Sequence, residues 1–188
     1  MVTRLTVTLR EFEPDDAPTV TEAMLLSENY AVAMTGYFPE GGDLQSLFYV
    51  LPETADPNVK HLYTILADDT VAGLADTLIG WPDTTTVTIG LFLVHPRFQR
   101  MGVASQALEA GTVIARKMGL QTLRAACPRN WLPGEQFLAG HGFVQQVSSS
   151  TAPMNRITHP HEASHLVDAW VRGFRPLSDD AGSSQPGV

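Results

Sequence analysis

The turn at residues 99–104, which reads Gln-Arg-Met-Gly-Val-Ala, is the stretch of this sequence best suited to chemistry. An apolar run rich in β-forming residues, 91–94, precedes it, and a helical pattern that continues to about Met118 follows it. A turn from a strand into a helix points several backbone N–H groups at one place, where the positive end of the helix dipole favours an anion. Gly102 lets a ligand approach the backbone closely, and Ala104 keeps that approach narrow. The stretch therefore predicts a binding site for an anion such as a pyrophosphate.

Charge is distributed unevenly along the 188-residue chain. The net charge is −8, yet the window from residue 97 to residue 129 holds six basic residues and only one acidic residue. A basic island around a phosphate-type turn suits a polyanionic ligand, whereas the acidic remainder disfavours nucleic acid and favours a cationic or amine substrate. Arg116, Lys117 and Arg124 are equally well explained as solvated residues on a helix or strand face.

The elements that must hold this turn are predicted from hydrophobic periodicity and from turn signals. Three strands joined by tight turns form an antiparallel meander that leads into the turn, and the helix after it crosses over to a parallel strand. The last strand is placed to pair with the strand before it. Most of 28–60 is expected to be loop, because Gly and Pro interrupt it repeatedly. The predicted strands are 4–9, 61–67, 71–79, 84–94, 121–126, 142–147 and 165–172, and the predicted helices are 15–27, 44–50, 103–118 and 131–139.

Length and composition fit one globular domain, residues 1–175, followed by a tail, 176–188, whose Ser, Asp, Gly and Pro content predicts disorder. No leader pattern opens the chain and no window reaches the length of a membrane span, so we expect a cytoplasmic protein without membrane contact. Cys127 is the only cysteine, which excludes an intramolecular disulfide and a Cys-rich metal site. Because His159, His161 and His165 lack Cys or carboxylate partners at ligand spacing, no metal is expected.

The turn and its flanks resemble the pyrophosphate loop of the GNAT N-acetyltransferase superfamily. In that family the loop reads Gln/Arg-x-x-Gly-x-Gly/Ala and follows a strand that ends Val-x-Pro. Here Val94 and Pro96 stand before the loop, and Gln99, Gly102 and Ala104 hold its defined positions. The match is typical of a small bacterial member of the family.

A second part of the resemblance lies after the helix. GNAT chains carry an Asn just past the following strand, then a short helix, then a Gly-Phe pair that opens the next strand. Asn130, Gly142 and Phe143 stand at nearly that spacing, with one extra residue between them. These motifs extend the resemblance over roughly residues 4–147.

The resemblance implies an α/β fold of the α+β type, a single GNAT acyl-CoA N-acyltransferase domain. Its sheet would be mixed, mostly antiparallel, with about six or seven strands flanked by helices. It also implies direct transfer of an acetyl group from acetyl-CoA to a primary amine of a small molecule, without a metal. Metabolites, amino acids, polyamines and antibiotics are the expected acceptors, and a homodimer formed through the C-terminal region is compatible with this fold.

Acetyl-CoA would be held by the residues that match the family's contact positions. The backbones of Phe92, Leu93 and Val94 would contact the pantetheine and the acyl carbonyl. The loop and the first helical turn would hold the pyrophosphate, and two later residues would complete the site. The predicted acetyl-CoA contacts outside the strand are Gln99, Arg100, Met101, Gly102, Val103, Ala104, Ser105, Asn130 and Phe137.

Acetyl transfer to an amine needs an oxyanion donor near the carbonyl, a neutral amine and a proton for the leaving thiolate. Many family members place a Tyr five residues before the Phe of Gly-Phe, but here that position is Leu138, preceded by Phe137. Some relatives use a Glu on the strand before the loop, and 84–94 contains no carboxylate. The candidate bases are Asp76, His95, His165 and Asp168, of which Asp76 and His165 are the catalytic candidates to test first.

Aromatic residues of the irregular segment 28–60 are candidates to line the acceptor pocket: Tyr30, Tyr37, Phe38, Phe48 and Tyr49. Two other hypotheses stay open. The missing Tyr and Glu favour a non-catalytic acyl-CoA-binding or regulatory module, and the same fold also serves acetyltransferases that act on a protein N-terminus or lysine. Another class of nucleotide-binding α/β enzyme is disfavoured, because a meander precedes the loop where strands would alternate with helices.

Overall fold

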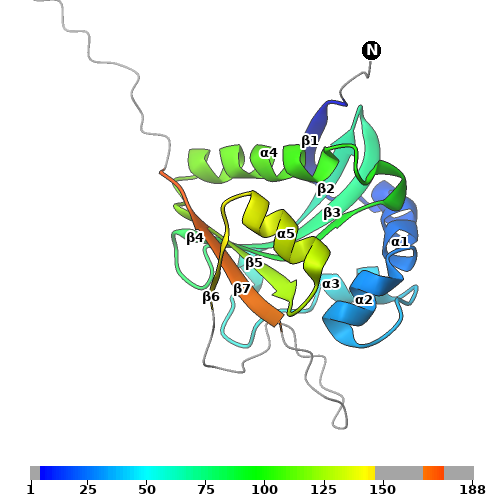
Figure 1. The fold of residues 1–188 in the computed structure, drawn as a ribbon, viewed down its shortest axis with the longest axis horizontal. Helices are drawn as coiled ribbons and strands as arrows, with labels where there is room; N and C mark the ends of the chain where they lie inside the picture. The colour runs from blue at the N-terminus through cyan, green and yellow to red at the C-terminus, as the bar shows by residue number, and fades with distance from the viewer. Residues whose placement is uncertain (1–4, 147–166, 176–188) are drawn as a thin grey trace, which may run out of the picture.

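The computed structural model describes residues 5–146 and 167–175, which form one seven-stranded sheet flanked by helices (Figure 1). The strand order is β1-β2-β3-β4-β5-β7-β6, and every neighbouring pair is antiparallel except β4 and β5. The predicted meander, the parallel crossover and the mixed, mostly antiparallel sheet are therefore confirmed. The strands are β1 (Val7–Glu11), β2 (Lys60–Ala67), β3 (Thr70–Ile79), β4 (Thr86–Val94), β5 (Thr122–Pro128), β6 (Val144–Gln146) and β7 (Val167–Gly173).

Helices cover both faces of the sheet because α1, α3, α4 and α5 each present an apolar side to it. Leu108 and Leu138 pack with Leu123 in a cluster that joins two helices to one face. Val20 and Leu44 pack with residues of the opposite face, in a second cluster that joins two other helices to it. The helices of the described residues are α1 (Ala17–Leu25), α2 (Glu28–Thr35), α3 (Asp43–Leu47), α4 (Val103–Lys117) and α5 (Leu132–Gly140), of which α4 and α5 share the first face and α1 and α3 the second.

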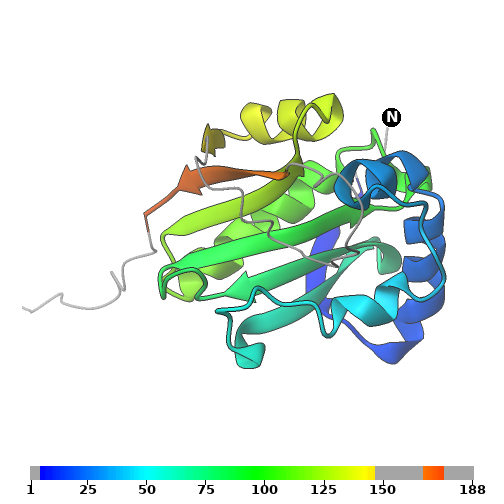
Figure 2. The same ribbon diagram turned by 90° about the horizontal axis from the view of Figure 1, so that it is seen from below.

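The C-terminal ends of β4 and β5 point toward the first three helices. In Figure 2, α1, α2 and α3, coloured blue to cyan, gather at the end of the sheet where these two parallel strands finish. Helix α1 contacts β3 and β4, and α2 contacts β5. Ligand sites of sheets with parallel strands form outside the carboxyl ends of those strands, so this end is where a site is expected.

Helix α2 corrects the prediction of a loop directly after residue 27. The segment Glu28–Thr35 is helical, and it ends at Gly36, whose φ of 84° makes it a left-handed cap with its N–H bonded to the Val32 carbonyl. Tyr, Asn, Val and Thr are weak helix formers, and no residue of α2 is fully buried, so neither propensity nor periodicity marked it. Helix α3 confirms the predicted short helix in 44–50, although it begins at Asp43 and ends at Leu47.

The predicted pairing of the last strand with the strand after α5 is also confirmed, because β6 pairs with β7. Strand β7 pairs in addition with β5 along its whole length and so lies between β5 and β6. The predicted tail 176–188, Arg4 of the first predicted strand and His165 of the last one lie outside the described residues. Among the residues described, no helix is both long and apolar enough to cross a bilayer.

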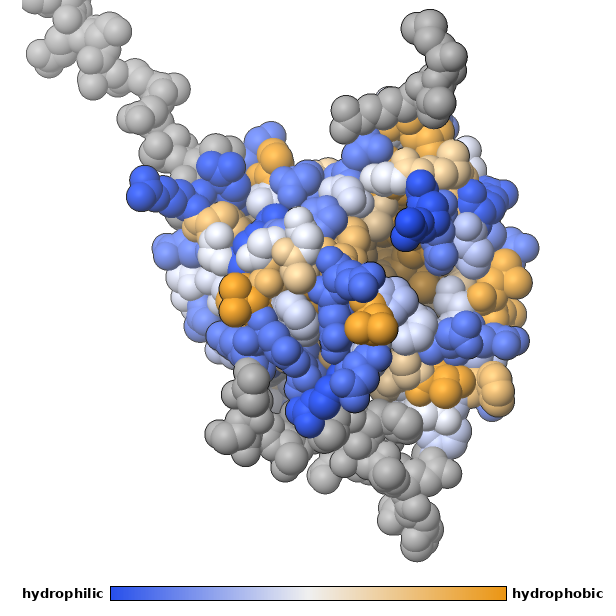
Figure 3. Space-filling model, in the orientation of Figure 1, coloured by the Kyte–Doolittle hydropathy of each residue, from blue (hydrophilic) through white to orange (hydrophobic). Residues whose placement is uncertain are grey.

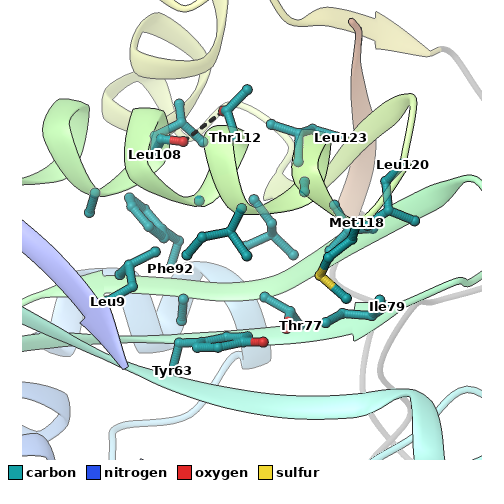
Figure 4. Close-up of a pocket in the computed structure, with 17 residues that line it drawn as sticks. Leu9, Tyr63, Thr77, Ile79, Phe92, Leu108, Thr112, Met118, Leu120 and Leu123 are labelled. Atoms are coloured by element: carbon teal, nitrogen blue, oxygen red, sulfur yellow. Dashed lines mark hydrogen bonds between the residues drawn. The ribbon is translucent and has the colours of Figure 1, made fainter. Parts of the chain in front are cut away.

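A small apolar cavity of about 60 Å³ separates α4 from the sheet (Figure 4). Figure 4 shows Phe92 and Leu9 below α4, and the Thr112 hydroxyl turned back to donate to the Leu108 carbonyl at 2.7 Å. Gly111 also lines this cavity, so the helix lacks a side chain where it could be filled. The cavity is a packing gap of the core.

Candidate functional site

Strands β4 and β5 part from one another at the end of the sheet that faces α2. Their parallel pairing begins at Thr86 with Thr122 and ends at Ile89 with Ala125, although β4 continues to Val94 and β5 to Pro128. A cleft of about 1220 Å³ occupies the space between the separated ends. Figure 3 shows its opening as a hollow with apolar walls between α5 and the α1–α2 region.

A β-bulge explains where the two strands separate. In the β3–β4 ladder Asp76 pairs with Leu91 and Thr77 pairs with Ile89, so Gly90 is an extra residue without a partner. A bulge bends the strand that carries it. This one lies a single residue past the last β4–β5 pair, and it therefore turns β4 away from β5 at the point where the cleft begins.

The N-terminus of α4 forms one wall of the cleft. Gly102 precedes the helix with φ 80° and provides no side-chain cap, and Arg100 also has a left-handed φ, 63°. The first backbone N–H groups of an α-helix have no acceptor within the helix. Those of Val103, Ala104 and Ser105 belong to residues that line the cleft, so an anion bound there would complete the helix cap.

Residues 25–143 match the sequence model of the Acetyltransferase (GNAT) family, and the matched range includes the cleft's turn, both separated strands and α5. The chain belongs to the GNAT acetyltransferase family. Among curated proteins, by contrast, no sequence matches it.

Solved structures share the fold of this GNAT chain. An acetyltransferase from Thermus thermophilus is 21% identical with a TM-score of 0.65, over 91% of this chain and 99% of that one. The enzyme from Salmonella typhimurium that modifies the N-terminal serine of 50S ribosomal protein L7/L12 is 16% identical with a TM-score of 0.68, over 90% and 95%. The PaiA N-acetyltransferase from Thermoplasma acidophilum, solved in complex with coenzyme A, is 14% identical with a TM-score of 0.58, over 90% and 99%. At these identities the likeness shows the fold alone.

The structure brings most of the predicted CoA-binding residues of this GNAT domain to one cleft. Lining it are Phe92, Leu93, Val94, Gln99, Arg100, Gly102, Val103, Ala104, Ser105 and Phe137. Met101 and Asn130 are the exceptions. Met101 is 53% exposed, and Asn130 sits in a left-handed turn whose N–H donates to the Glu135 carboxylate at 2.8 Å.

Gln99 is placed to hold the loop, because its side chain bonds to the strand before it. Its side-chain amide donates to the Val94 carbonyl at 2.9 Å, which ties the loop to the end of β4. His95 fixes the same corner from the other side: its N–H donates to the Ala72 carbonyl at 2.8 Å and its Nδ1 accepts from the Arg97 N–H at 3.2 Å. The other ring nitrogen lies 3.5 Å from a carboxylate oxygen of Glu22. Because His95 is buried and does not line the cleft, a structural role suits it better than that of a base.

Asp76 lies beside the bulge on the sheet face that carries α1 and α3. Its carboxylate is buried and paired with Lys60, whose ammonium lies 2.9 Å from Oδ1 and 3.0 Å from Oδ2, the second contact having hydrogen-bond geometry. Burial raises the pKa of Asp76, while the charge and hydrogen bond of Lys60 act against that rise. The Asp76 side chain does not line the cleft.

Asp168, another predicted base, belongs to a hydrogen-bond network outside the lining of the cleft. Asp168 is buried and accepts from the Arg129 guanidinium at 2.7 and 3.0 Å and from the Gln145 amide at 2.8 Å. The Arg129 hydrogen bond holds the pKa of Asp168 below its usual range even though burial acts to raise it. This network joins β5, β6 and β7 and is structural. His165 lies outside the described residues.

Tyr30 is the one aromatic residue of the predicted acceptor set that lines the cleft. It comes from α2, and its ring centroid lies 6.4 Å from that of Trp131, at the start of α5. The other four members of the set, Tyr37, Phe38, Phe48 and Tyr49, are between 44% and 75% exposed and do not line it. Because α2 was not predicted, nothing in the sequence favoured Tyr30 over its neighbours.

Proposed function

We propose that this protein transfers the acetyl group of acetyl-CoA to the primary amine of a small molecule by direct attack of the amine on the thioester. One observation carries the proposal: the cleft between the separated ends of β4 and β5 is a single space, lined at the N-terminus of α4 and by Tyr30 of α2. A ligand with an anionic group at one end and an extended chain fits a space of that shape. Coenzyme A has this form, so acetyl-CoA is the co-substrate we assign.

The chain's own residues suit each part of that co-substrate. The N–H groups at the start of α4 would hold the pyrophosphate, with Arg100 adding charge at the loop. Beyond Ile89, β4 no longer pairs with β5, so the backbone groups it turns toward β5 are available to the pantetheine and the acyl carbonyl. A backbone N–H aimed at the carbonyl oxygen would stabilise the negative charge that develops there.

Acidic residues predominate in the segment that supplies α1 and α2. The segment 11–43, which includes α1, α2 and the start of α3, contains eight acidic residues and no basic residue. Glu28 of this segment lines the cleft. A carboxylate at the cleft would attract a cationic amine, which supports an amine as the acceptor. Asp76 remains our candidate base and would act through ordered water, because its side chain does not reach the cleft surface.

Two alternatives follow from specific observations. Leu138 occupies the place of the family tyrosine and is 8% exposed, so the usual proton donor is absent, and a protein that binds acyl-CoA without transfer is the second candidate. A protein acceptor is the third, because the structural relative from Salmonella typhimurium modifies a ribosomal protein N-terminus.

A combined thermal-shift and thiol-release screen tests the proposal. Acetyl-CoA and CoA should both raise the melting temperature, and free thiol should appear only when an accepted amine is present. The panel contains a polyamine, an amino-acid ester, an aminoglycoside and a short peptide with a free N-terminus. Binding without thiol release would favour the non-catalytic module, turnover of the peptide alone would favour a protein acceptor, and no shift with either nucleotide would contradict the whole proposal.

A further inference from the structure

The cleft needs a proton donor for the leaving thiolate that the family position cannot supply. Leu138 and Phe137 carry no acidic hydrogen. Among the described side chains that line the cleft, the phenol of Tyr30 and the thiol of Cys127 carry the most acidic hydrogens that can be given up at neutral pH. The guanidinium of Arg100 does not lose its proton in proteins.

Cys127 is poorly placed to act. Its side chain is 2% exposed, and its Sγ lies 3.6 Å from the Pro128 carbonyl that accepts its hydrogen. Helix α5 presses on it, because a Cβ on Gly134 would fall 2.8 Å from the sulfur. This thiol fills space between β5 and α5.

Tyr30 faces the cleft from α2. It lines the cleft, its ring centroid lies 6.4 Å from that of Trp131, and the backbone of Phe92, Asp76 on β3 and Cys127 on β5 all act on its pKa. The phenol O–H is a donor that a bound ligand can accept. Burial raises the pKa of Tyr30, so the hydroxyl stays protonated at neutral pH.

We propose that the Tyr30 hydroxyl protonates the sulfur of CoA as the thioester breaks, and so replaces the tyrosine that α5 lacks. In this step the amine nitrogen forms a bond to the acyl carbon, the carbon–sulfur bond breaks with its electron pair on sulfur, and the sulfur takes the Tyr30 proton. The amine nitrogen loses a proton, and water relays that proton to the Tyr30 phenolate. The sum is amine plus acetyl-CoA giving amide plus CoA. The assignment rests on the proposed function.

Kinetics of Tyr30→Phe test this role, with the amine that gives the fastest thiol release in the screen. The variant should bind acetyl-CoA with a dissociation constant within about threefold of wild type, while kcat falls about 100-fold or more, the usual range for loss of an acid catalyst. Tyr49→Phe, which removes the hydroxyl of a tyrosine that is 75% exposed, is the matched control and should leave both constants unchanged. A Tyr30→Phe variant that keeps kcat within about twofold, or that loses binding and turnover in equal proportion, would overturn the assignment.

Fluorinated tyrosine gives a readout that a purely structural role would not move. The chain has four tyrosines, and replacing all of them with difluorotyrosine lowers each phenol pKa with little change in size. In the fluorinated protein, kcat should then begin to fall at a lower pH than in the unmodified protein. An unchanged pH dependence at high pH would contradict Tyr30 as the acid. This measurement stands even if Tyr30→Phe fails to fold. Absence of transfer by wild type with every amine would instead contradict the proposed function, and the assignment with it.

Discussion

The ammonium of Lys60 lies between the two carboxylate oxygens of Asp76, 2.9 and 3.0 Å away, with both side chains more than nine-tenths buried. Lys60 also donates to the Val50 carbonyl at 2.9 Å, which ties the segment after α3 to β2. The pair stands beside the Gly90 bulge, because a Cβ at Gly90 would come within 3.4 Å of Asp76 Oδ2. A buried ion pair therefore supports the strand distortion that opens the cleft.

Breaking the Lys60–Asp76 pair should destabilise the protein more than removing it entirely. Lys60→Met should lower the free energy of unfolding by about 3 kcal/mol, because it leaves a buried carboxylate without its counter-charge. The double variant Lys60→Met/Asp76→Leu should recover most of that loss, as measured by urea unfolding. Strictly additive single effects would contradict the coupling. If Asp76 is also the base, the folded double variant should bind acetyl-CoA yet turn over about 100-fold more slowly.

Acid should weaken the β5–β6–β7 network through Asp168. The pKa of Asp168 is lowered in the fold, chiefly by the Arg129 hydrogen bond. A carboxylate whose pKa is lowered stabilises the fold fully above its unfolded pKa of about 3.9, and this contribution is lost as the pH falls through the lower folded value. Asp168→Asn should therefore cost about 2 kcal/mol at neutral pH and much less at about pH 2.5.

The control for the acid experiment is Asp15→Asn, at an exposed carboxylate in the turn before α1. It should leave the free energy of unfolding nearly unchanged at both pH values. A deficit of Asp168→Asn that is equally large in acid and at neutral pH would mean that its charge is not what stabilises the network.

Filling the gap beneath α4 should stabilise the protein without touching the cleft. Gly111→Ala replaces a helix-interior glycine, and its Cβ would meet Leu9 Cδ1 at 3.4 Å, an ordinary van der Waals contact. The gain should be about 1 kcal/mol in the free energy of unfolding, measured with urea. Gly119→Ala is the matched control. Its φ of 79° strains any side chain, so that variant should lose stability instead.

The parts of the fold that the sequence predicts are those with strong local signals. The helix after Gly102 carries a continuous apolar stripe, and the meander carries period-2 alternation between tight turns. The family motif identified residues of the cleft, because it includes both the turn and the end of the strand before it. Ten of the twelve predicted CoA contacts therefore line one space.

The parts that were not predicted depend on contacts between distant residues. Strand β7 pairs with β5 across about 40 to 50 residues of sequence, and no local pattern predicts that pairing. Lys60 and Asp76 meet only because the antiparallel register sets Lys60 opposite Leu78 and Leu62 opposite Asp76. Gln99 bonds to the Val94 carbonyl and Asn130 bonds through its backbone N–H to Glu135, and spacing alone does not show these contacts.

Acetyl transfer by wild type, Gly102→Asp and Gly119→Asp tests the central claim most directly, followed by NMR with ¹³C-acetyl-CoA and the accepted amine. Both variants place a carboxylate at a glycine with left-handed φ, 80° and 79°, at opposite ends of α4, so their backbone strain is matched. We predict that wild type and Gly119→Asp form the labelled N-acetyl product. Gly102→Asp should remain folded but form none, because its charge occupies the anion site at the helix N-terminus. A folded Gly102→Asp variant that acetylates the amine as fast as wild type would contradict the account.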